Sequence, residues 1–351
     1  MATKTSSGNF FEDFSVGMQL VHATPRTVTD GDVAVYASLY GPRFAVQSSA
    51  PFAQAIGYPH APIDDLIVFH QVFGKTVPDV SLNAVANLGY AECVFGVPVF
   101  AGDTLRAESE VIGLKENSNK RTGVVYVRSR GLNQRDEVVL DYARWVMVHK
   151  RDQDAPAPEA VVPDLAEVVG ADAFDVAALP DGLANYDDRL SGSPHRFGDY
   201  QVGEKIDHVD AMTLEEAEHQ MATRLYQNTA KVHFNALEQK SSRFGHRLIY
   251  GGVIISMVRA LSFNGLANAF KMLAINSGRH VAPTFAGDTI YAWSEVLDVQ
   301  AIEGHSGIGA VRLRTIGLKD CNTSTFPRMG DDGRYDPSVV LDLDYWVGLP
   351  I

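Results

Sequence analysis

The chain has 351 residues, of which 46% are hydrophobic and 21% are charged, and its formal net charge at pH 7 is -13. This composition is typical of a globular protein with enough apolar residues for one large core or two ordinary ones. The negative charge argues against binding to nucleic acid or to an anionic membrane, because clustered Lys and Arg side chains hold phosphate groups.

Two features of the sequence bear on the compartment. Cys93 and Cys321 are the only cysteines, and they give neither a disulfide framework nor a zinc-binding spacing. The first residues, MATKTSSGNFFEDF, lack the apolar core of a signal peptide, and no apolar run is long enough to cross a bilayer. We therefore expect reduced thiols in a cytoplasmic protein.

The first half begins with a short predicted helix and continues to a buried one. TDGDVAVYASLY starts at Thr29, a predicted N-cap, and carries acidic residues in its first turn before apolar residues at helical spacing. After an irregular stretch, IDDLIVFHQVFGKTV (residues 63–77) is almost continuously apolar, which predicts a helix that is buried on most sides.

Strands with period-two alternation follow the buried helix. In LRAESEVI one face carries Leu105, Ala107, Ser109 and Val111, and the opposite face carries Arg106, Glu108 and Glu110. Gly102 and Asp103 precede this strand and predict a turn that starts it. We therefore expect a long antiparallel sheet wrapped around one buried helix.

The second half repeats the first at a nearly constant offset. FEDFSVGMQL at Phe11 matches FGDYQVGEKI at Phe197, and 197 minus 11 is 186. PVFAGDTLRAESEV at Pro98 matches PTFAGDTIYAWSEV at Pro283, an offset of 185. TLEEAEHQMATRLY, with Thr213 as its predicted N-cap, and the buried run GGVIISMVRALSFNGLA repeat the two helices, and CNTSTFPRMGDDGRYDPS is an insertion in the second copy.

Ordered matches over most of both halves indicate an internal duplication. We predict an N-terminal domain over residues 1–150, a linker rich in Ala, Pro and Asp over residues 151–195, and a C-terminal domain over residues 196–351. The predicted fold class is α+β, with two tandem domains of the same kind.

The repeated segments resemble the MaoC-like hot-dog domains. The resemblance rests on F-x-D-[FY]-x-V-G, on a helix that ends in LY, and on P-x-F-x-G-D-T before an alternating strand. It implies a double hot-dog hydratase or dehydratase that acts on CoA thioesters. GYPHAPIDDLIVFHQVFGKTV and NLGYAECVFGVPVFAGDTL resemble the mesaconyl-CoA hydratases, or β-methylmalyl-CoA dehydratases, in particular.

The resemblance also implies where the catalytic groups lie. The family's G-D-x-N-P-x-H signature aligns with residues 41–47, which have neither catalytic residue, and with residues 227–233, which keep His233 but have Asn228 in place of the Asp. His233 is the expected acid and base, because imidazole titrates near neutrality, with a structural surface or core histidine as the alternative. Asn228 would position a water molecule, with a turn residue as the alternative, and Asp65 is a second catalytic candidate.

Backbone groups would complete the site. Gly251 and Gly252 start the second buried helix, where free N–H groups favour an enolate oxygen. Expected substrate contacts in the first half, each with ordinary packing as its alternative, are His60, Ala61, Pro62, Ile63, Asn87, Leu88, Gly89, Val97, Pro98 and Val99. A dicarboxylic acyl group needs a cation, and among Arg43, Lys231, Arg243 and Arg247 we favour the arginines Arg43 and Arg247.

The sequence leaves three functions open. The first is an acyl-CoA hydratase and dehydratase that interconverts β-methylmalyl-CoA and mesaconyl-CoA by acid and base catalysis with a bound water. The others are a hot-dog thioesterase and a non-catalytic acyl-CoA-binding protein. We expect no metal and no cofactor beyond the coenzyme A of the substrate, no nucleic-acid or membrane partner, and a homo-oligomer.

Overall fold

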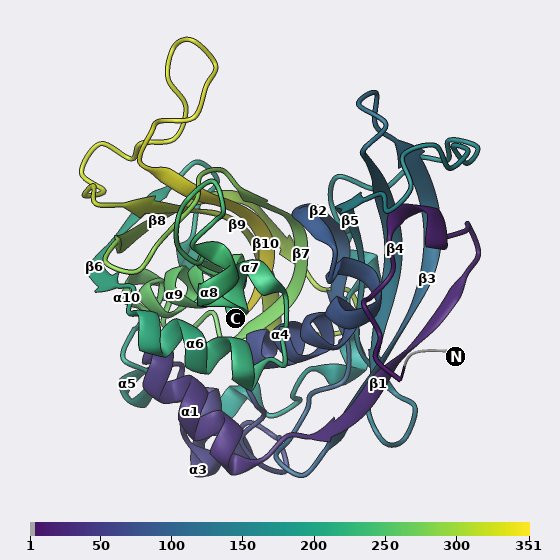
Figure 1. Cartoon of the computed structure of the whole chain (residues 1–351). Coiled ribbons are helices and arrows are strands. Elements are labelled where there is room, and N and C mark those ends of the chain that lie inside the picture. The colour runs from purple at the N-terminus through teal and green to yellow at the C-terminus, as the bar shows by residue number, and fades with distance from the viewer. Residues whose placement is uncertain (1–3) are drawn as a thin grey trace.

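A computed structural model describes residues 4–351 of the chain. Within these residues ten strands form one antiparallel sheet in the order β1-β3-β4-β5-β2-β7-β10-β9-β8-β6 (Figure 1). The first five strands are β1 (Gln19–Thr27), β2 (Ala84–Phe95), β3 (Thr104–Glu116), β4 (Thr122–Leu132) and β5 (Val138–His149). The others are β6 (Lys205–Thr213), β7 (Lys271–His280), β8 (Thr289–Ala301), β9 (Ile308–Lys319) and β10 (Val339–Pro350).

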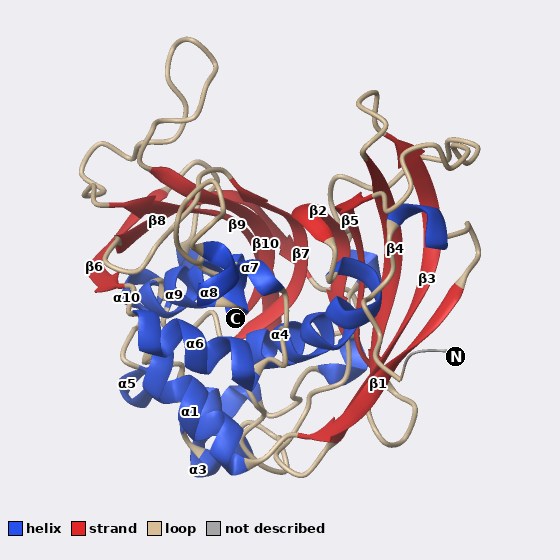
Figure 2. Cartoon of the chain, in the orientation of Figure 1, coloured by secondary structure: helices blue, strands red, loops and turns tan. Residues whose placement is uncertain are grey.

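The helices gather on one side of this curved sheet (Figure 2). The first half contains α1 (Asp30–Tyr40), α2 (Ala45–Ser48), α3 (Ala50–Ala55) and α4 (Asp65–Thr76), and the connecting segment contains α5 (Asp188–Ser191). The second half contains α6 (Glu216–Leu225), α7 (Lys231–Phe234), α8 (Ala236–Gln239), α9 (Gly251–Leu261) and α10 (Phe263–Leu266).

Each half wraps its strands around one buried helix. All of α4 is buried, and so is α9 except for Gly251. Helix α4 contacts β1, β3, β4 and β5, and helix α9 contacts the matching strands β6, β8, β9 and β10. The expected pair of hot-dog domains is confirmed.

The two halves join edge to edge through the antiparallel strands β2 and β7, where Cys93 lies opposite Ile275. Side chains at matching positions also meet between the halves: the hydroxyl of Tyr226 donates a hydrogen bond to that of Tyr40 at 3.1 Å, and 226 minus 40 is 186. The duplicated halves therefore form an internal pseudo-dimer.

The same packing solutions occur in both halves. A Cβ atom at Gly123 would lie 2.3 Å from the ring of Phe11, and one at Gly309 would lie 2.3 Å from the ring of Phe197. Each glycine therefore leaves room for the aromatic residue that precedes the first strand of its half. These pairs explain why the FEDF and FGDY segments keep a phenylalanine first.

The local predictions are confirmed in the first copy and wrong at one cap in the second. Thr29 accepts a hydrogen bond from the Asp32 backbone and caps α1. Thr213 does not cap a helix: it is the last residue of β6, still pairs with β8, and α6 begins after Glu215. The cap therefore lies two residues later than the helical pattern indicates, at the position that matches Thr29, since 215 minus 186 is 29.

The predicted turn and strand faces are confirmed. Gly102 has a φ of 102°, and the Asp103 carboxylate accepts a hydrogen bond from the Phe100 backbone at 2.9 Å, which closes the turn before β3. Leu105, Ala107, Ser109 and Val111 are buried, whereas the residues between them are partly or fully exposed.

Two segments lie outside the duplicated plan. The insertion at residues 321–338 connects β9 to β10 as a long loop that projects from the sheet (Figure 1). The segment over residues 151–195 packs against the body, because Phe174, Leu183 and Tyr186 belong to a buried cluster with Phe52 and Phe270. The domain boundaries at residues 150 and 195 remain a prediction.

Within residues 4–351 no helix combines the length and the apolar character that a membrane span requires.

Candidate active site

The N-termini of α4 and α9 occupy matching places in the two halves, and they differ in how their free N–H groups are used. Asp64 caps α4: its carboxylate accepts a hydrogen bond from the Leu66 backbone N–H at 2.8 Å. Burial raises the pKa of Asp64 to about 6. The next residue, Asp65, is ion-paired with Lys271 and accepts a hydrogen bond from the Met272 N–H at 3.0 Å. This helix start is closed by the protein's own carboxylates.

Helix α9 has no such cap. Its N-cap residue, Tyr250, makes no side-chain capping bond, and 250 minus 64 is 186, so Tyr250 stands where the first half has Asp64. The N–H groups of Gly251 and Gly252 belong to the first turn and have no acceptor within the helix. The start of α9 can therefore bind an oxygen atom that carries negative charge.

His233 lies beside this helix start. Its ring centroid is 5.5 Å from that of Tyr250, and its Nδ1 donates a hydrogen bond to the Leu248 carbonyl at 2.8 Å. A carbonyl only accepts, so the proton of the neutral ring is on Nδ1 and the lone pair is on Nε2. Burial lowers the pKa of His233 to about 4, so the ring is a neutral base at pH 7.

Asn228 has the turn role that the sequence left open as its alternative. The side chain is buried, and its Oδ1 accepts a hydrogen bond from the Ala230 N–H at 3.1 Å. A Cβ atom at Gly74 of α4 would lie 1.7 Å from the Tyr226 carbonyl and 3.3 Å from the Asn228 nitrogen, so this segment packs directly on α4. The structure places Asn228 five residues before His233 on a turn fixed by that contact.

The structure does not bring Asp65 to His233. Asp65 binds Lys271 at the first residue of β7, whereas the α9 site lies at the last residue, His280. The Asp65 carboxylate therefore holds α4 to β7 of the neighbouring half, and none of its hydrogen bonds among the described residues goes to His233 or Asn228.

Most first-half candidates surround the start of α4 and have partners of their own. The Ile63 N–H donates to the Val99 carbonyl at 2.9 Å, and the Val97 N–H donates to the Val138 carbonyl at 3.1 Å. Ile63, Pro62 and Val99 are buried, Ala61, Val97 and Pro98 are partly buried, and His60 is exposed. These backbone contacts are the packing alternative for Val97, Val99 and Ile63.

The candidates on β2 lie nearer the α9 site. Asn87, Leu88 and Gly89 precede Tyr90, whose ring centroid is 6.4 Å from that of His280. Both polar side-chain atoms of Asn87 are buried and have no hydrogen-bond partner within residues 4–351. Buried amides in native proteins are normally paired, so Asn87 is a strong candidate for contact with a ligand.

The two favoured arginines are placed differently. The side chain of Arg247 is 8% exposed and forms an ion pair with Glu216 at 2.6 Å. It lies close to His219, whose pKa is lowered to about 3 mainly by burial, with contributions from a protonated His233 and from the charge of Arg247. Arg43 is 59% exposed and stacks on Phe263 with its guanidinium carbon 4.6 Å from the ring centroid, so of the two arginines Arg247 is the buried one.

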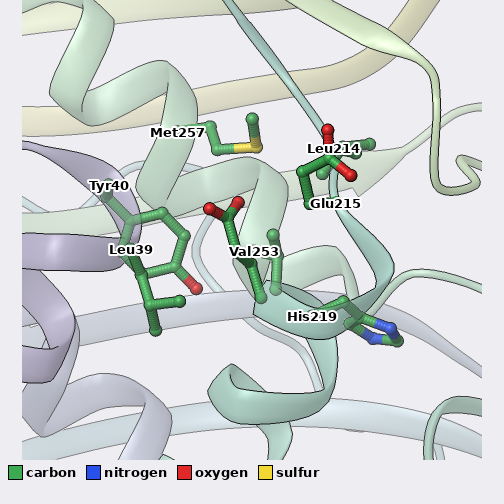
Figure 3. A pocket seen from close by; sticks show the side chains of 8 residues that line it. Leu39, Tyr40, Leu214, Glu215, His219, Val253 and Met257 are labelled. Atoms are coloured by element: carbon green, nitrogen blue, oxygen red, sulfur yellow. The ribbon is translucent and has the colours of Figure 1, made fainter.

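A small cavity lies between the halves next to this site. Its volume is about 10 Å³, which is room for about one water molecule. Figure 3 shows Tyr40 on one side and His219 on the other, with the His219 ring turned away from Tyr40. A larger cavity of about 420 Å³ lies elsewhere, beside Arg196 and His305, and its lining includes none of the candidate residues.

Sequence reasoning missed two residues of the site. His219 accepts a hydrogen bond from the Tyr250 N–H at 3.0 Å and so fixes the chain at the entry to α9. His280 lies against Gly251: a Cβ atom there would be 2.3 Å from its Cε1. A comparison of the two copies could have indicated His280: it matches Phe95 of the first copy (280 minus 185), so a histidine replaces a phenylalanine at this position. Within residues 4–351, His, Cys, Asp and Glu side chains form no group of three that could hold a metal ion.

Comparison with known proteins identifies the family. The model of the mesaconyl-CoA hydratase family matches residues 1–327. The chain is 61% identical to a β-methylmalyl-CoA dehydratase of Chloroflexus aurantiacus, covering 100% of this chain and 99% of the relative. It is 58% identical to a mesaconyl-CoA hydratase of Cereibacter sphaeroides, covering 99% of each.

Solved structures similar to this chain support the same family and the double hot-dog fold. A MaoC domain protein dehydratase from Chloroflexus aurantiacus superposes with a TM-score of 0.97 at 61% identity over 99% of both chains. A double hot-dog protein from Mycobacterium tuberculosis gives a TM-score of 0.77 at 27% identity over 98% of this chain and 99% of that one. The expected resemblance is confirmed, and the chain belongs to the mesaconyl-CoA hydratase family.

Proposed function

We propose that this chain catalyses the reversible dehydration of β-methylmalyl-CoA to mesaconyl-CoA (2-methylfumaryl-CoA), as a hydro-lyase. The relatives that match it over nearly its whole length are a β-methylmalyl-CoA dehydratase and a mesaconyl-CoA hydratase. The observation that carries the proposal is the pairing of the uncapped start of α9 with a neutral His233. The α4 site has neither feature, so the C-terminal half is the catalytic half.

The chemistry needs one base and one site for negative charge. In the dehydration direction Nε2 of His233 takes the proton from the carbon next to the thioester, and the electron pair moves onto the thioester oxygen. The N–H groups of Gly251 and Gly252 stabilise that oxygen. The enolate then expels the hydroxyl group from the neighbouring carbon, and His233 returns its proton to that group as water leaves.

This scheme explains how the site works with Asn228 in place of an aspartate. His233 takes one proton and gives one proton in each turnover, so no second acid is needed to balance the reaction. Asn228 holds the turn before His233 through its bond to Ala230. Asn87 is a candidate hydrogen-bond partner for the substrate because its amide is buried and has no partner in the part of the chain that the structure describes.

The free carboxylate of the acyl group requires a cation, and we assign this role to Arg247. Its guanidinium is mostly buried beside His219, and its present partner, Glu216, is 60% exposed. A planar guanidinium holds a carboxylate through two parallel hydrogen bonds. Exchange of Glu216 for the substrate carboxylate would place the acyl chain between Arg247 and the start of α9.

Ultraviolet absorbance tests the proposal directly. Incubation of the protein with mesaconyl-CoA is expected to bleach the band of the conjugated enoyl thioester, and His233→Ala is expected to abolish that loss. A parallel assay for free thiol separates hydration from thioester hydrolysis. If the wild-type protein binds mesaconyl-CoA but leaves the band unchanged, the chain is a binding protein and the proposal is wrong.

Association of copies and independence from metals also remain predictions. We expect a homo-oligomer by light scattering and full activity after treatment with a chelator, with coenzyme A supplied as part of the substrate.

A further inference from the structure

His280 is a second imidazole at the start of α9 that the mechanism above does not use. It is the last residue of β7, is partly buried, and packs so closely on Gly251 that a Cβ atom there would lie 2.3 Å from Cε1 and 2.5 Å from Nε2. Its Nε2 is buried and has no hydrogen-bond partner among the described residues. A buried polar atom without a partner costs about 1–3 kcal/mol and calls for an explanation.

The protonation state of His280 limits what it can do. Burial, and to a lesser degree the nearby His233 when it is protonated, lower the pKa of His280 to about 4. At neutral pH the ring therefore has one N–H group and one lone pair. A neutral ring can donate a hydrogen bond, but it is a poor source of a proton at pH 7.

The comparison of the two halves connects His280 with the open helix start. At the α4 site the matching residue is Phe95, which has no hydrogen-bonding group, and Asp64 already binds the Leu66 N–H. At the α9 site the cap is absent and a histidine replaces the phenylalanine. At the start of α9, where the backbone N–H groups are free, the His280 ring therefore adds a further possible hydrogen-bond donor.

We propose that His280 donates a hydrogen bond from Nε2 to the thioester oxygen of the substrate, beside the backbone N–H groups of Gly251 and Gly252. The bond strengthens as the oxygen gains charge in the enolate, so it lowers the barrier more than it tightens binding of the ground state. No proton is transferred to or from His280 in the reaction. This inference rests on the proposed function and deepens it.

The test compares three variants of the full-length protein. His280→Phe copies the residue of the first half and removes the donor, and His280→Gln keeps an N–H donor that cannot exchange a proton in the reaction. His305→Phe is a matched control, because its side chain is also partly buried and lies at the cavity beside Arg196. Circular dichroism and thermal melts establish that each variant is folded.

We expect kcat for mesaconyl-CoA to fall about a hundredfold in His280→Phe, with KM within a few-fold of wild type. His280→Gln should retain at least ten times the kcat of His280→Phe, and His305→Phe should match wild type. Exchange of the α-proton of β-methylmalyl-CoA into deuterium oxide should slow in parallel, since this exchange reports enolate formation. Wild-type kcat in His280→Phe, or equal losses in the Phe and Gln variants, would overturn the inference.

A spectroscopic comparison with His280→Gln covers the case in which His280→Phe does not fold. The infrared carbonyl stretch of a bound saturated thioester, methylsuccinyl-CoA, should move to lower wavenumber than in solution, and by less in His280→Gln than in wild type. An unshifted band in wild type contradicts the hydrogen bond. If wild-type protein leaves mesaconyl-CoA unchanged, the proposed function fails; if only the His280 results fail, the hydratase remains and this inference is wrong.

Discussion

The contact between Gly251 and His280 makes a sharp prediction for Gly251→Ala. The new methyl carbon would lie 2.3 Å from Cε1 of His280, whereas ordinary contacts begin at 3.4 Å, so the two groups must separate by about 1 Å (3.4 minus 2.3). A displacement of about 1 Å in a catalytic site costs about a hundredfold in rate. Overpacking lowers the free energy of unfolding by about 1–3 kcal/mol. The change from glycine to alanine raises it by about 1 kcal/mol, because alanine restricts the unfolded chain.

We therefore expect kcat for mesaconyl-CoA to fall about a hundredfold, while the free energy of unfolding changes by no more than about 2 kcal/mol. Steady-state absorbance kinetics and urea titration measure the two quantities separately. Gly198→Ala is the matched control, because a Cβ atom there meets no heavy atom within 4 Å. A Gly251→Ala protein with wild-type kcat would refute the geometry that we derive for the start of α9.

Three further predictions test other parts of the molecule. The pKa of His233 is lowered to about 4, so kcat/KM should decline only as the pH falls through about 4. At pH 5 a base of this pKa is about 90% neutral, whereas an unperturbed histidine is about 3% neutral. A pH-rate profile with half-activity near pH 6.5 would contradict this prediction. Asp65→Asn leaves Lys271 buried without its partner, so the free energy of unfolding measured in urea should fall by about 3–5 kcal/mol, while kcat per folded molecule stays unchanged. Addition of Lys271→Met should largely restore the stability. Gly74 lies inside a helix, where a change to alanine normally raises the free energy of unfolding by about 1 kcal/mol. Here the new Cβ would lie 1.7 Å from the Tyr226 carbonyl, so Gly74→Ala should instead lower the free energy of unfolding by about 3 kcal/mol in urea titration. A stabilised protein would refute the contact.

Much of the fold could be predicted from the sequence because the duplication doubles each local signal. The alternation around Leu105 and the apolar run of α4 have counterparts in the second half, so a pattern that is ambiguous once is supported twice. The predicted cap at Thr213 failed because Thr213 matches Thr27 at the end of β1 (213 minus 186), where the strand is still paired, and the position that matches the Thr29 cap is Glu215. Pairing partners distant in the chain are not visible in a short window.

The proposed active site was harder to predict, since its parts come from separate segments. His233 was found through a signature, but His280 follows no helix or strand rule and becomes significant only when its ring is seen against Gly251. Asp65 was attractive in sequence because it follows His60 and starts a helix. Its carboxylate is taken up by an ion pair with Lys271, 206 residues away in the chain, a contact that no local pattern predicts.

The Asp64 and Tyr250 positions illustrate what joining two copies in one polypeptide makes possible. In an assembly of identical subunits any substitution appears at every helix entry, so closing one entry with a carboxylate would close them all. Here the carboxylate at residue 64 leaves residue 250 untouched. One entry can specialise in holding the architecture together while the other is kept free for chemistry, a division of labour that strict symmetry forbids.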